Sequence, residues 1–186
     1  MGEDGQLLMR YACEGDVQSL SRLVVAHSRW LSAYLRGLMG DGPDVEDALQ
    51  DVWTKVIRSA GSYRGGSVRA YFVRIARSVV VDGFRRRGAP LLSLDAETEE
   101  GERVLPEPES GGLSPDAACE RLATSEEIRQ AVRALPVRMR DVLLMRIEGE
   151  LTFKEIAEEL RAPLGSVLTW MHEATKRLKR SLGGSQ

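Results

Sequence analysis

The chain contains few of the residues that build metal centres, disulfide networks and catalytic sites. Among its 186 residues are two cysteines and two histidines. Cys13 and Cys119 are far apart and have no second ligand at metal-binding spacing, which indicates a reducing compartment. Neither His27 nor His172 is paired in the sequence with a carboxylate or a cysteine, and no phosphate-binding glycine motif is present. We therefore expect no catalytic residue, no metal site and no cofactor, and a protein that is not an enzyme.

Long apolar segments are also missing. No run of residues approaches the length of a membrane span, and the polar start at residues 3–6 does not resemble a signal peptide. The sequence therefore predicts a cytoplasmic protein without membrane insertion.

A strong excess of one charge is missing as well, because the formal net charge is −2. The charges are, however, unevenly distributed. Residues 91–118 carry a net charge of −7, which leaves +5 for the rest, and residues 64–87 contain seven arginines and a single acid, Asp82. An arginine cluster of this density is typical of a surface that binds phosphates.

Residues 149–182 have the pattern of a helix-turn-helix. Thr152 and Glu155 form a capping box, which predicts the start of a helix. The segment 163–165 ends that helix, and Ser166 is a natural cap for a second one. The second helix of such a pair fits the major groove of DNA. Helical hairpins also occur in small bundles that bind no DNA, so this pattern alone leaves both interpretations open.

The apolar pattern of the N-terminal half predicts helices throughout, with one at about residues 16–39 and another at 44–59. The second places its apolar residues on one face and Asp47, Gln50 and Asp51 on the opposite face. Such a polar face is most often simply solvated, but it also suits a basic partner surface.

Residues 61–88 interleave aromatic and arginine side chains beside a glycine-containing loop. Bases of single-stranded DNA stack on aromatic rings while phosphates pair with guanidinium groups, so this combination favours binding of single strands. Phe72 has the spacing of a core residue. For Tyr63 and Tyr71, a core position and a base-stacking position are equally compatible with the pattern.

Between the two halves, the acidic stretch contains several prolines and glycines and has no apolar period. Its composition is typical of a linker of low order. The less favoured alternative is that the acidic stretch occupies the basic surfaces and restrains the free protein. We therefore predict an all-α fold with two small helical domains, 1–89 and 116–186, joined by a flexible acidic linker at 90–115.

Three blocks in this order resemble a bacterial RNA polymerase sigma factor of the extracytoplasmic-function group of the sigma-70 family. The blocks are DVEDALQDVWTKV at 44–56, GSYRGGSVRAYFVRIARSVVVDGFRRR at 61–87, and LPVRMRDVLLMRIEGELTFKEIAEEL at 135–160 with the helix that follows. They resemble, in turn, the core-binding segment of region 2, the segment of region 2 that melts and reads the −10 element, and region 4.

The resemblance implies a subunit that binds core RNA polymerase, through its clamp helices and flap, and directs it to promoter DNA. By matching position, the residues that contact the polymerase are Asp47, Gln50 and Asp51. The residues that contact the −10 element, by the same match, are Tyr63, Arg64, Tyr71, Arg74, Arg77 and Arg85. The second helix of the helix-turn-helix is matched to the −35 element. Its outward face carries Ser166, Thr169, His172, Glu173, Lys176 and Arg180. Members of the family often pair with an anti-sigma factor, and the resemblance leaves open whether this chain does.

The chain departs from the family pattern early in the second helix. Leu168 and Trp170 stand where a lysine and an arginine are frequent, which reduces the capacity for guanine contacts. Trp170 is three residues after Val167. This spacing favours packing at the edge of the apolar stripe over the alternative, a contact with a DNA base. A stand-alone helix-turn-helix repressor or activator would explain residues 149–182 equally well, but not the two blocks of the N-terminal half.

Overall fold

The computed structural model describes residues 2–40, 44–86 and 125–183, and these residues form helices joined by short loops, with no strand among them. The predicted linker at 90–115 lies outside the described residues. The helices of the N-terminal unit are α1 (Glu3–Glu14), α2 (Val17–Met39), α3 (Asp44–Ser59), the short 3-10 turn η1 (Ala60–Ser62) and α4 (Val68–Arg86). Those of the C-terminal unit are α6 (Ser125–Arg133), α7 (Val137–Ile147), α8 (Phe153–Leu160) and α9 (Leu164–Gly183). The all-α fold class is confirmed.

Local signals in the sequence explain where the first helices begin and end. Gly15 ends α1 in the left-handed conformation with φ +69°, which glycine adopts without a steric penalty. Asp16 then caps α2, and its carboxylate accepts a hydrogen bond from the backbone N–H of Gln18 at 3.0 Å. The apolar faces of α2, α3 and α4 meet around Phe72, which is fully buried.

The helix-turn-helix of the C-terminal unit is formed by α8 and α9. The capping box predicted at Thr152 and Glu155 is present, with both reciprocal hydrogen bonds. Arg161 ends α8 in the left-handed conformation, with φ 51°. The expected cap of the next helix at Ser166 is wrong, because α9 begins at Leu164. The carbonyl of Pro163 accepts the first hydrogen bond, from the N–H of Val167 at 3.3 Å, so the helix starts directly after the proline and Ser166 lies in its first turn.

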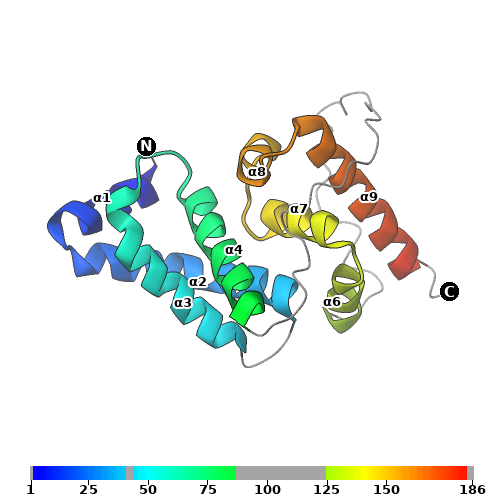
Figure 1. Ribbon diagram of the computed structural model, residues 1–186, viewed down its shortest axis with the longest axis horizontal. Coiled ribbons are helices and arrows are strands. Elements are labelled where there is room, and N and C mark those ends of the chain that lie inside the picture. Colours follow the sequence, from blue (N-terminus) through cyan, green and yellow to red (C-terminus); the bar gives the residue numbers. More distant parts are fainter. Residues whose placement is uncertain (1, 41–43, 87–124, 184–186) are drawn as a thin grey trace.

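The two units pack directly against each other (Figure 1). Helix α2 contacts α6 and α7, and α4 contacts α8. Buried side chains from both units, including Leu38, Val73, Leu144 and Ile156, belong to one apolar cluster. Gly37 allows the closest approach, because a Cβ atom built there would lie 2.6 Å from the side-chain methyl carbons of Leu144.

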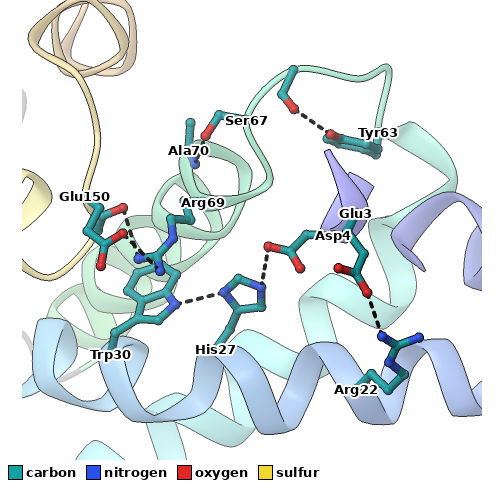
Figure 2. Close-up of polar contacts among 12 residues, drawn as sticks. Glu3, Asp4, Arg22, His27, Trp30, Tyr63, Ser67, Arg69, Ala70 and Glu150 are labelled. Carbon is teal, nitrogen blue, oxygen red and sulfur yellow. Dashed lines mark hydrogen bonds and ion pairs between the residues drawn. The ribbon is translucent and has the colours of Figure 1, made fainter. Parts of the chain in front are cut away.

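A buried histidine connects α1 to the rest of the N-terminal unit (Figure 2). His27 Nδ1 accepts a hydrogen bond from Trp30 Nε1 at 2.9 Å. Its Nε2 lies 3.1 Å from Asp4 Oδ2, without the alignment of a full hydrogen bond. The sequence reading that no carboxylate is paired with this histidine was wrong, because the partner is on a different helix. Burial lowers the pKa of His27, although the Asp4 charge opposes this shift.

We expect this histidine to make the free energy of unfolding sensitive to acid. The folded pKa of His27 is below its ordinary value, so the unfolded chain binds the extra proton more readily. The contribution of neutral His27 to the free energy of unfolding is then fully present above about pH 6.5 and is lost as the pH falls through the folded pKa. Urea unfolding at pH 7.5 and 5.5 should show a steeper acid loss for the parent chain than for His27→Gln. Equal losses of unfolding free energy in the parent and in His27→Gln would show that His27 does not cause the sensitivity to acid.

Candidate functional site

The polar face predicted on α3 is exposed along its length. Asp47, Gln50 and Asp51 are all exposed, whereas Val52 and Val56 on the opposite side are fully buried. Asp51 accepts from Arg86 of α4 at 3.3 Å, between two side chains that are more than half exposed. A face of exposed carboxylate and amide groups can bind a basic partner surface without rearrangement of the helix.

A cleft between α3 and α4 adjoins this face. Its walls are formed by Asp51, Thr54, Lys55, Arg58, Val79, Asp82, Arg85 and Arg86. Lys55 donates to Asp82 at 2.6 Å, and this hydrogen bond is the main cause that lowers the pKa of the Asp82 carboxyl. Arg85 is exposed at the edge of the cleft, where its guanidinium group is accessible to a phosphate.

The tyrosines predicted to stack on bases lie against each other at the start of α4. Their ring centroids are 5.4 Å apart in an edge-on arrangement. Tyr63 is buried and donates to the carbonyl of Gly66 at 2.8 Å, whereas Tyr71 is half-buried and shares a 2.7 Å hydrogen bond with Ser59. Arg64 is exposed beside them and donates to the carbonyl of Gly61 at 2.6 Å. In this arrangement Tyr71 and Arg64 are accessible and the Tyr63 ring is not.

The remaining arginines of the predicted −10 set are bonded to carboxylates of the C-terminal unit. Arg74 Nε donates to Glu159 at 3.0 Å, and Arg77 Nε donates to Asp141 at 3.1 Å. Arg77 Nη1 also lies 3.6 Å from Glu159. Arg74 remains mostly exposed, but the Arg77 side chain is only 10% exposed. These arginines are therefore brought together with acids that the sequence reading did not assign to any site.

Asp141 is the central acid of this contact and is fully buried on α7. Its carboxylate accepts from Arg77 and, at 2.8 Å, from the hydroxyl of Tyr34 on α2. Burial raises the pKa of Asp141, while the Arg77 charge opposes this shift. Burial also raises the pKa of Tyr34 well above its ordinary value, so the phenol stays protonated and donates. The sequence signal that could have shown this site is an acid that stands directly before the apolar run at 142–145 of α7.

Helix α9 packs on α6, α7 and α8 through Val167 and Ala174, which are fully buried. The predicted reading face is turned away from that contact. His172, Lys176 and Arg180 are exposed, Ser166, Thr169 and Glu173 are half-buried, and Lys176 Nζ lies 3.8 Å from Glu173 Oε1.

Trp170 packs against the apolar cluster, and the guanidinium carbon of Arg138 lies 5.9 Å from its ring centroid. The prediction that this ring is a packing residue is confirmed.

Within the parts of the chain that the structure describes, no helix is long and apolar enough to span a bilayer. Family models match both units of the chain. Residues 23–89 match Sigma-70 region 2, and residues 112–178 match Sigma-70, region 4. The ECF RNA polymerase sigma-E factor of Escherichia coli (strain K12) is 28% identical over 93% of this chain and 91% of its own length. The ECF RNA polymerase sigma factor SigW of Bacillus subtilis (strain 168) is 26% identical over 91% of each.

The chain belongs to the extracytoplasmic-function group of the sigma-70 family. It is a sigma factor that directs promoter-specific transcription initiation with RNA polymerase, as its sequence blocks predicted. RNA polymerase sigma-H factor of Pseudomonas aeruginosa is a further relative, 25% identical over 97% of this chain and 94% of its own.

Two solved structures have the same fold. One is CnrH in complex with the cytosolic domain of CnrY, with a TM-score of 0.70, 17% identity, and coverage of 98% of this sigma factor and 99% of that chain. The other is RpoE in complex with the anti-sigma factor NepR from Bartonella quintana, with a TM-score of 0.65, 18% identity, and coverage of 89% and 98%.

Proposed function

We propose that this sigma factor binds core RNA polymerase through the polar face of α3 and contacts two promoter elements with different units. The region 2 unit, within residues 1–89, reads and opens the −10 element through Arg64, Tyr71, Arg74, Arg77 and Arg85, and the buried Tyr63 ring supports that of Tyr71. The region 4 unit, within residues 116–186, binds the −35 element with the outer face of α9. Residues 90–115 connect them, and the factor acts in the cytoplasm without catalysing a reaction itself.

The observation that carries this proposal is the order of three surfaces along one chain. The free acidic face of α3 is followed by the arginines and tyrosines of α4, and a helix-turn-helix comes last. A stand-alone repressor or activator needs only the third. Two contacts on one tethered chain also strengthen each other, because binding at one promoter element raises the effective concentration of the other unit near its own.

Gel filtration with core polymerase, followed by run-off transcription on genomic fragments, tests this function. We expect co-elution with the core enzyme and promoter-specific transcripts that neither core nor sigma factor produces alone. Binding of specific duplex DNA by the chain alone, with no association with core enzyme, would instead identify a stand-alone regulator.

Tyr71 gives the sharpest test of base stacking because its ring is half-buried, whereas the Tyr63 ring that it contacts edge-on is buried. In the holoenzyme, Tyr71→Ala should weaken binding to a forked −10 probe by about 1–3 kcal/mol, with a smaller loss on intact duplex. Tyr71→Phe keeps the ring and removes only the hydroxyl that contacts Ser59, so its affinity should stay near that of the parent. Equal losses on both probes for Tyr71→Ala would show that the ring is structural.

A further inference from the structure

The first turn of α1 is tied to α2 by two carboxylates that differ in their surroundings. Glu3 pairs with Arg22 at 2.6 Å, and both of these side chains are more than half exposed. Asp4 instead lies 3.1 Å from Nε2 of His27, whose side chain is only 3% exposed. An exposed ion pair contributes little to stability, whereas a buried donor without an acceptor is costly. The Asp4 contact is therefore the one that fixes the position of this turn.

His27 faces Asp4 in its neutral form and in a defined tautomer. Its Nδ1 accepts a hydrogen bond from Trp30 Nε1 at 2.9 Å, which leaves the ring proton on Nε2. The rings of Phe72 and Trp30 pack edge-on against the imidazole, at centroid distances of 5.1 and 5.9 Å. Nε2 is buried and has no aligned partner within the described residues, so the facing Asp4 carboxylate is the acceptor available to its proton.

Helix α1 also contacts the segment that carries the first of the predicted −10 residues. We name residues 60–67, between α3 and α4, the Tyr63 loop. Helix α1 contacts the η1 turn of this loop, and the buried side chains of Leu8 and Tyr63 belong to one apolar cluster. Figure 2 shows Asp4 between His27 and the Tyr63 ring, and the Asp4 charge adds to burial in raising the pKa of the Tyr63 phenol. One carboxylate therefore lies near both α2 and the Tyr63 loop.

The Tyr63 loop depends on its tyrosine for a fixed shape. Gly65 and Gly66 have φ +96° and +94°, and glycine has many other conformations available to it. The Tyr63 hydroxyl donates to the carbonyl of Gly66 at 2.8 Å and so closes the loop on itself. The buried Tyr63 ring meets the half-buried Tyr71 ring edge-on, at 5.4 Å. Displacement of Tyr63 would consequently change both the loop and the support of the Tyr71 ring.

We propose that His27 and Asp4 are positioning residues for −10 DNA, because they fix the first turn of α1 against the Tyr63 loop and so hold Tyr71 ready for the bases. Neither His27 nor Asp4 contacts DNA in this role. A binding surface that is ordered beforehand loses less conformational entropy when its ligand binds. The inference rests on the proposed role of Arg64 and Tyr71 at the −10 element, and it gives α1 a part in promoter opening.

The first test measures hydrogen exchange of the full chain by mass spectrometry, without polymerase. Asp4→Ala removes the acceptor for His27 Nε2, so amides of α1 and of the Tyr63 loop should exchange at least about threefold faster. Glu3→Ala is the matched control, because it removes the neighbouring carboxylate and its exposed pair with Arg22. Exchange in the Tyr63 loop should stay parental in this control. Asp4→Asn supplies an amide oxygen as the acceptor without the charge, and should restore parental exchange.

The second test measures binding of a forked −10 probe by each variant in complex with core polymerase. Asp4→Ala should bind the probe about three- to tenfold more weakly, as expected when one or two side chains are ordered on binding rather than before it. Asp4→Asn and Glu3→Ala should bind as the parent does, and all variants should bind a −35 duplex equally. If the two residues act as a unit, Asp4→Ala combined with His27→Gln should lose no more than the larger of the single losses.

Unchanged exchange in the Tyr63 loop of Asp4→Ala would overturn the proposal. So would faster exchange without loss of affinity for the forked probe, or an equal loss in Glu3→Ala. Because the Asp4 side chain is 43% exposed at a helix end, the variant should keep parental helix content, which circular dichroism checks. A parent chain that binds neither core polymerase nor the probe would refute the proposed function, while the exchange experiment would still report whether Asp4 fixes the loop.

Discussion

Reversing the charges of Asp47 and Asp51 to lysine should abolish binding to core polymerase. Both carboxylates are exposed on the polar face of α3. Asp51 also accepts from Arg86, but an exposed ion pair of this kind contributes about 1 kcal/mol or less. We expect the loss to come from repulsion at the interface, because each exposed substitution should change stability by less than about 0.5 kcal/mol.

Co-elution with core enzyme on gel filtration measures this loss, and circular dichroism checks the helix content. The matched control is Glu14→Lys combined with Glu158→Lys, which makes the same change in net charge at exposed positions on α1 and α8. The control should co-elute as the parent does. If both double variants lose binding, net charge decides the association; if neither does, the α3 face is not the contact.

Sequence alone was sufficient for the existence of α2, α3, α8 and α9 and for the outward faces of α3 and α9. These depend on local signals, such as the Thr152 and Glu155 capping box, that act within one or two turns of chain. Asp47, Gln50 and Asp51 are exposed as periodicity predicted, because an amphipathic helix exposes the side opposite its apolar stripe.

The contact between the two helical units could not be predicted in this way. Asp141 accepts from Tyr34 and Arg77, which are 107 and 64 residues away in the sequence. Periodicity places Arg77 on a basic stripe but does not show which acid lies opposite. Composition predicts a domain boundary at the acidic stretch but not how the two units pack. The packing of Leu144 against Gly37 depends on the shapes of two helices far apart in the chain. The pairing of His27 with Asp4 was missed for the same reason.

The helix start at Leu164 also shows the limit of a local signal. Ser166 has the side chain of a cap, but Pro163 occupies the position before the helix, so the first turn begins three residues earlier. The shift leaves the outward face of α9 unchanged, because that face is determined by the burial of Val167 and Ala174.

Replacing Trp170 with alanine should lower the stability of the sigma factor without changing which promoter it prefers. The ring packs against the apolar cluster, with Arg138 over it at 5.9 Å. Because the ring is only half-buried, we expect a loss of about 2–3 kcal/mol, below the range of about 3–5 kcal/mol typical of buried Trp→Ala changes. Thermal unfolding of the full chain measures this loss, and binding to a panel of −35 duplexes measures preference.

Glu173→Ala is the reciprocal change on the same helix and should alter preference without a comparable loss of stability. Its carboxylate is partly exposed, and Lys176 lies 3.8 Å away in a weak surface pair. A carboxylate in the major groove accepts from a cytosine amino group, so its loss should change the preference at one −35 position by about 1–3 kcal/mol. Lys176→Ala should instead weaken all sequences alike and reduce the salt dependence of binding by about one unit, as expected for one phosphate contact. If Trp170→Ala changes base preference while leaving the melting temperature unaltered, then the tryptophan contacts the bases and the reading face of α9 has been assigned to the wrong side.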